Sequence, residues 1–91
     1  MDSVSFAKVK KDLKKIPIHI VRNLQKWALQ VEMLGIKEIR KIPGYHDEPL
    51  TGKRKMERSI RLSKGYRAIY TESKEEKINL ITVKEVNKHD Y

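Results

Sequence analysis

The chain has 91 residues, of which 38% are hydrophobic and 36% charged, and its formal net charge is +9 at pH 7. This length supports one modest hydrophobic core, so we expect a single domain over residues 1–91. The absence of cysteine excludes disulfides and thiolate metal sites. Neither a signal peptide nor an apolar run of the roughly 20 residues that a spanning helix needs is visible, so we expect a cytoplasmic protein.

The positive charge is concentrated in two segments. Residues 1–26 hold seven basic and two acidic side chains, and residues 53–67 hold seven basic and one acidic. Excess lysine can serve solubility alone, but seven cations within fifteen residues repel one another, and a bound anion would relieve that repulsion. A field of this sign also attracts polyanions and raises their association rate. We therefore expect a polyanion-binding function.

The first half of the chain predicts helices. Residues 4–6 form a short strand or lead into a lysine-rich helix that continues through Val9 and Leu13. Pro17 then suits a first helical position, and Gly35 suits a C-terminal cap. Between them apolar residues recur at steps of three and four, which indicates a helix with one buried face. These apolar residues are Ile20, Leu24, Trp27, Ala28, Val31 and Leu34.

The second half predicts strands after an irregular segment over residues 36–49. Strands are expected over 58–63, 66–71 and 78–86, with turns at Lys64-Gly65 and over 72–77. In the first of these strands Arg61 lies on the face opposite to Ile60 and Leu62. The predicted fold class is α+β, with a small antiparallel sheet packed against an N-terminal helical hairpin.

Several of these pieces, taken in order, resemble the RelE/ParE superfamily of toxins from bacterial type II toxin–antitoxin systems. Residues 49–52 match a PL-x-G loop, Arg61 matches an arginine-bearing strand, and residues 65–70 match the strand motif G-x-Y-R-x-[IV]-[YF]. The resemblance covers nearly the whole chain. It implies one RelE-like toxin domain with a positively charged cleft, neutralised by a cognate antitoxin that is acidic and partly disordered.

The family divides in function. Its RelE, YoeB and HigB branches cleave mRNA in the ribosomal A site, whereas the ParE branch inhibits DNA gyrase. The ending NKHDY resembles the first group and implies a ribosome-dependent endoribonuclease with mRNA and the ribosome (16S rRNA) as partners, no cofactor and no metal. A ParE-like gyrase inhibitor without nuclease activity is the alternative, and a plain nucleic-acid-binding module is a third possibility.

Cleavage of this kind begins when the 2′-hydroxyl attacks the neighbouring phosphorus, so it needs proton transfer and stabilisation of negative charge. The resemblance assigns Arg67 and Arg61 to the phosphate, because a planar guanidinium matches phosphate oxygens. It makes His89 the leading general acid or base, Tyr91 a group that stacks on a base or orients the phosphate, and Glu48 a lesser candidate for the base. His19 and His46 have no such context, and we expect them to be structural or solvated. The substrate-binding residues are expected to be Lys53, Arg54, Lys55 and Arg58.

Overall fold

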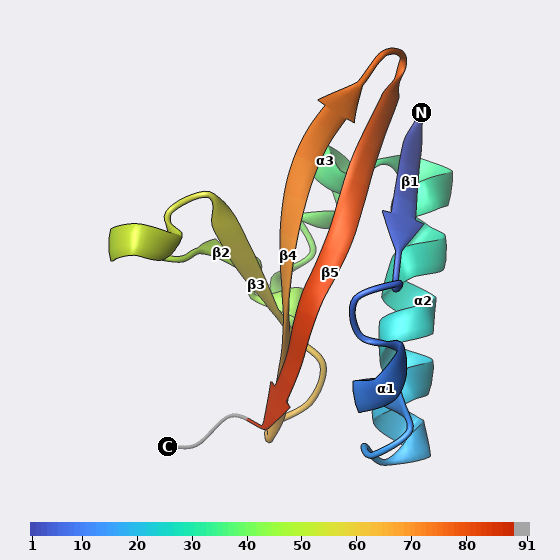
Figure 1. Cartoon of the computed structure of the whole chain (residues 1–91), viewed down its shortest axis with the longest axis vertical. Coiled ribbons are helices and arrows are strands. Elements are labelled where there is room, and N and C mark those ends of the chain that lie inside the picture. The colour runs from blue at the N-terminus through green and yellow to red at the C-terminus, as the bar shows by residue number, and fades with distance from the viewer. Residues whose placement is uncertain (89–91) are drawn as a thin grey trace.

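The structure, a computed structural model, describes residues 1–88. A five-stranded sheet has the strand order β1-β5-β4-β3-β2, and helices cover one of its faces (Figure 1). The strands are β1 (Asp2–Ser5), β2 (Glu48–Pro49), β3 (Glu57–Arg61), β4 (Tyr66–Glu75) and β5 (Ile78–Lys88). The helices are α1 (Lys10–Leu13), α2 (Ile18–Leu34) and α3 (Ile36–Ile39), with 3-10 turns η1 (Pro43–Tyr45) and η2 (Gly52–Arg54).

Helix α2 forms where the apolar period predicted it. Its buried residues from Ile20 to Val31 share one face, whereas Leu34 is exposed, so the buried stripe is one turn shorter than predicted. Pro17 caps the helix rather than occupying its first turn. At the other end Gly35 adopts φ +87°, and its N–H bonds to the Val31 carbonyl at 2.8 Å.

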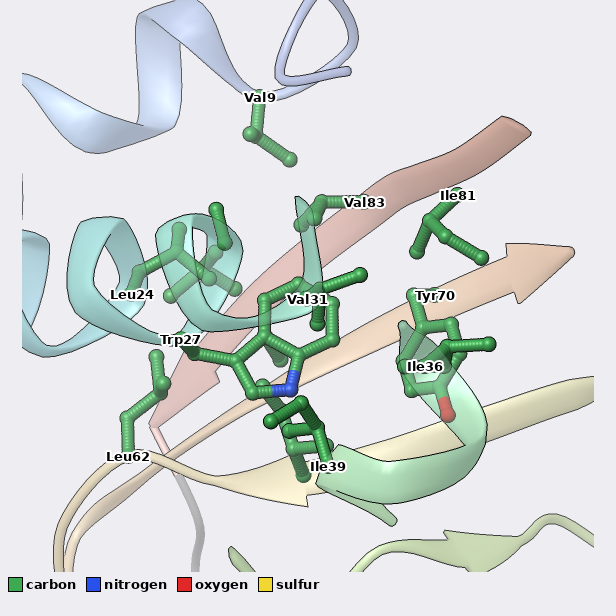
Figure 2. Close-up of a cluster of buried hydrophobic side chains, with 14 of the residues drawn as sticks. Val9, Leu24, Trp27, Val31, Ile36, Ile39, Leu62, Tyr70, Ile81 and Val83 are labelled. Carbon is green, nitrogen blue, oxygen red and sulfur yellow. The ribbon is translucent and has the colours of Figure 1, made fainter. Parts of the chain in front are cut away.

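The core lies between α2, α3 and the sheet (Figure 2). Trp27 is fully buried, as predicted, and its ring centroid lies 5.3 Å from that of Tyr70. Residues 36–39 were expected to be irregular, but they form α3, which buries Ile36 and Ile39 against the same cluster. A four-residue helix is too short to leave a periodic signal in the sequence.

The α+β fold class is confirmed, with one difference in strand direction. The pairs β2–β3, β3–β4 and β4–β5 are antiparallel, but β1 pairs in parallel with β5, from Asp2 opposite Asn79 to Ser5 opposite Thr82. The sheet is therefore mixed. For residues 4–6 the residue pattern left a strand or a helix lead open, and the structure forms a strand there. The direction of its pairing depends on a partner more than 70 residues away.

No helix within residues 1–88 combines the length and apolar character needed to cross a bilayer.

The backbone at Gly35 gives the first testable prediction. A Cβ there would have Asp2 Oδ2 as its nearest neighbour, at 3.7 Å, so the cost of Gly35→Ala comes from the positive φ rather than from a clash. We expect a loss of about 1–3 kcal/mol in the free energy of unfolding, measured by urea denaturation. Gly44→Ala is the matched control, because its Cβ meets nothing within 4 Å and its φ is not positive. Equal stabilities of the two variants would contradict this account.

Candidate active site

Two arginines face each other on neighbouring strands at one end of the β3–β4 pair. In the β3–β4 register Arg61 lies directly opposite Arg67, and their chain neighbours Ile60, Leu62 and Ala68 are buried in the core. Like charges placed directly opposite across an antiparallel pair destabilise a sheet, because their Cβ atoms are only about 5 Å apart. Within residues 1–88 neither guanidinium makes an ion pair. The arrangement is therefore suited to an anion.

Both arginines line a pocket of about 240 Å³ together with Glu48, Ser59 and His46. Glu48 reaches this pocket because β2 pairs with β3 and places Glu48 opposite Ser59. Ser59 lies two residues before Arg61 on the same strand, so this pairing brings the Glu48 carboxylate into the pocket with the two guanidinium groups. The pocket combines cations that can hold a phosphate with a carboxylate and an imidazole that can exchange protons.

Sequence reasoning missed His46 as a site residue. It follows η1 in the left-handed conformation, with φ 45° and ψ 49°, and its N–H bonds to the Pro43 carbonyl at 3.1 Å. This turn directs the chain from η1 into β2. No local pattern marks His46, because its left-handed conformation breaks the alternation of an extended segment, so its place in the pocket depends on the fold.

Asp47, between these two pocket residues, is directed into the molecule. Its carboxyl is 1% exposed and accepts a hydrogen bond from Arg58 Nε at 2.6 Å. The Tyr70 hydroxyl donates to the other oxygen of Asp47 and accepts from Arg40 Nε at 3.1 Å. Burial, together with the bond to Asp47, raises the pKa of Tyr70 and keeps its hydroxyl protonated as a donor.

This network fixes the backbone of the segment that carries the pocket's acidic and imidazole groups. Because Asp47 is held by groups from β3 and β4, His46 and Glu48 are tied to the strands that carry Arg61 and Arg67. Positioning of this kind is what proton-transfer chemistry requires.

The four residues expected to bind the substrate backbone lie outside this pocket. Arg58 is paired with Asp47, and Arg54 is paired with Glu57 at 2.6 Å and also with Glu85. Lys53 and Lys55 are exposed, in and just after η2, which projects from the β2–β3 edge of the sheet (Figure 1). Their role in binding substrate stays a prediction.

His89 and Tyr91 lie outside the described residues. The last described residues of β5 are Asn87, which pairs with Arg67, and Lys88, which pairs with Tyr66. Strand β5 therefore runs alongside the arginine end of β4. The catalytic roles expected of His89 and Tyr91 stay predictions. Within residues 1–88 no three His, Asp or Glu side chains are grouped so that they could hold a metal ion.

Comparisons with known proteins identify the fold. No family profile matches the chain, and no curated protein matches it. Among solved structures, the YoeB/ParE toxin from Agrobacterium tumefaciens is 15% identical, with a TM-score of 0.63 and 98% of each chain covered. The toxin–antitoxin complex RelBE2 from Mycobacterium tuberculosis is 18% identical, with a TM-score of 0.66 and 96% of each chain covered.

A third similar structure is YafQ from E. coli, which is 18% identical with a TM-score of 0.63, covering 97% of this chain and 91% of that one. Because the likeness extends over nearly the full length of each chain, it is the whole domain fold that is shared. The protein therefore shares its overall fold with these three toxin structures, which agrees with the α+β fold that its motifs predicted.

The Asp47 network yields a stability prediction. Asp47→Asn removes the charge that pairs with Arg58, whose side chain is 28% exposed. We expect a loss of about 2 kcal/mol in the free energy of unfolding. This loss is smaller than that for breaking a fully buried ion pair, because part of the Arg58 side chain is exposed to solvent. The matched control is Glu38→Gln, which breaks the exposed Lys41–Glu38 pair and should cost less than about 0.5 kcal/mol. Urea denaturation that gives equal losses for both variants would refute the structural role of Asp47.

Two glutamates predict a loss of stability in acid. A hydrogen bond from Lys84, supported by Arg54, lowers the pKa of Glu57. Burial alone would raise the pKa of Glu72, but hydrogen bonds from Asn79 and Arg40 outweigh it and lower that pKa. Both carboxylates bind protons less readily in the folded protein than in the unfolded chain. Their contribution to the stability of the fold is therefore present above about pH 4.5 and is lost as the pH falls through their folded pKa values.

The measurement is the free energy of unfolding between pH 7 and pH 3. We expect the wild type to lose stability below about pH 4.5 and the double variant Glu57→Gln/Glu72→Gln to show a shallower decline. Parallel pH profiles for the wild type and the double variant would contradict the assignment.

Proposed function

We propose that this protein is the toxin of a type II toxin–antitoxin pair and acts as a ribosome-dependent endoribonuclease on mRNA in the A site. The observation that carries the proposal is the facing pair Arg61 and Arg67, in a pocket that also holds Glu48 and His46. Similar structures described as toxins support the toxin part of the proposal.

The arginines have a defined role in the proposed reaction. The scissile phosphate lies between the two guanidinium groups, and the 2′-hydroxyl oxygen of the preceding ribose attacks its phosphorus. A new O–P bond forms while the bond to the departing 5′-oxygen breaks, so the phosphate carries additional negative charge in the transition state. Arg61 and Arg67 stabilise that charge by paired N–H donors in a fixed position. With this task assigned to protein cations, the proposed mechanism is metal-independent.

Two proton transfers complete the reaction. One group accepts the proton of the 2′-hydroxyl, and another donates a proton to the 5′-oxygen. We propose Glu48 and His46, which line the pocket, as candidates for these two groups. His89, the residue after Lys88 in the sequence, is a further candidate. Tyr91 is proposed to stack on a base, and Lys53 and Lys55 to hold the RNA backbone.

The antitoxin is the proposed protein partner. Two similar structures are described as toxin–antitoxin complexes, RelBE2 and DinJ–YafQ. A chain with net charge +9 is complementary to an acidic antitoxin, and covering Arg61 and Arg67 would block the site. We propose that both proteins act in the cytoplasm, where mRNA and ribosomes are found.

Gyrase inhibition is the second candidate, because one of the similar structures is described as a YoeB/ParE toxin. This function requires a binding surface but no proton-transfer groups. The two candidates differ in what they damage first, the message or the chromosome.

Induction in bacteria, followed by primer extension on a translated message, tests the proposal. We expect cuts at ribosome-occupied codons with the wild type, and a loss of roughly 100-fold or more in cleavage with Arg61→Ala, Arg67→Ala or His89→Ala. Arg22→Ala, an exposed arginine of α2, is the control and should cut normally. Full toxicity of the Arg61 and Arg67 variants, or growth arrest with intact mRNA and DNA-damage signalling, would overturn the nuclease assignment.

A further inference from the structure

Arg61 borders a second pocket. This pocket, of about 330 Å³, lies between α2, η1 and the end of β3. Arg61 lines both this pocket and the one that holds Arg67 and Glu48. The volume of this second pocket is at the lower end of the range for small-ligand sites. A chain bound at the arginine pair can therefore continue into this second pocket.

The wall formed by α2 is polar. Asn23, Lys26 and Gln30 line it, and their spacing of three and four residues places them along one helix face over about 10 Å. Asn23 Nδ2 donates to the Leu62 carbonyl at 2.8 Å, and Gln30 Oε1 accepts from the Tyr45 hydroxyl. Each amide is thus oriented by one bond, while Asn23 Oδ1 and Gln30 Nε2 bond to no other group within residues 1–88.

The remaining lining is largely apolar. Ile42, Tyr45 and Leu62 contribute to it, and Leu62 belongs to the core cluster. Burial raises the pKa of Tyr45, which keeps its hydroxyl protonated as the donor to Gln30. Apolar and aromatic surface beside oriented amide groups is the combination that recognises the face and edge of an unpaired base.

We propose that this pocket binds the nucleotide next to the scissile phosphate, with its base among the apolar side chains and its phosphate near Lys26. The inference rests on the proposed RNA substrate and adds a subsite to it. The described residues that line the pocket include two cations, Lys26 and Arg61, and no carboxylate. This charge suits a phosphodiester chain, and the shared Arg61 connects the subsite to the reacting phosphate.

Nuclear magnetic resonance titration tests the subsite without requiring cleavage. The probes are the four nucleoside 5′-monophosphates and, separately, inorganic phosphate. We expect a nucleotide to shift the amide signals of Asn23, Gln30 and Gly44, whereas phosphate shifts only those around Arg61 and Arg67. Identical shift patterns for the two kinds of probe would overturn the proposal, as would an acidic peptide that moves the pocket signals when no nucleotide does.

Two variants test the same pocket by affinity. Lys26→Glu reverses its charge, and Gly44→Trp adds bulk at a lining position where a Cβ meets nothing within 4 Å. We expect each to weaken binding of a short 2′-O-methyl single-stranded RNA about tenfold, as measured by fluorescence anisotropy. Lys37→Glu, an exposed lysine of α3, carries the same charge change and should alter binding less than about twofold.

The outcomes separate this inference from the proposed nuclease. If nucleotides shift the pocket signals and both variants weaken binding, the subsite is supported even if the protein cuts no message. If the protein cleaves mRNA while Lys26→Glu and Gly44→Trp bind and cleave as the wild type does, the subsite is wrong and the nuclease proposal stands.

Discussion

The repulsion between Arg61 and Arg67 is the interaction on which this account depends. The β3–β4 register places Arg61 and Arg67 directly opposite each other across the turn of residues 62–65, and neither guanidinium makes an ion pair within residues 1–88. The sheet tolerates the pair because Ile60 and Ala68 of the same two strands are buried on the opposite face. Core packing thus holds in place a charge arrangement that is unfavourable without an anion, which is how a binding site is preorganised.

The Asp47 network connects that core to the site. Tyr70 contacts Trp27 with its ring and Asp47 with its hydroxyl, so one side chain joins the packing of α2 to the segment that enters β2. The neighbours of Asp47 in the chain are the pocket residues His46 and Glu48. Groups that would exchange protons are therefore positioned by buried contacts rather than by the exposed loop before them.

The sequence predicted what depends on local periodicity. The spacing from Ile20 to Val31 and the alternation around Arg61 were sufficient for the main helix, the strand face of Arg61 and the fold class. It could not predict α3, the parallel pairing of β1, or the place of His46, because these depend on contacts with distant segments. The ion pairs of Arg54 and Arg58 were missed for the same reason. Which basic side chains of residues 53–67 form ion pairs depends on carboxylates that only the fold brings next to them.

Binding of the scissile phosphate by Arg61 and Arg67 can be observed in a crystal structure of the protein with a short RNA that carries a single 2′-deoxy residue at the cleavage position, which prevents attack. We expect the phosphate following that residue to contact the guanidinium groups of both Arg61 and Arg67. An RNA bound with its phosphates away from both groups, while the two arginines remain without an anion, would contradict it.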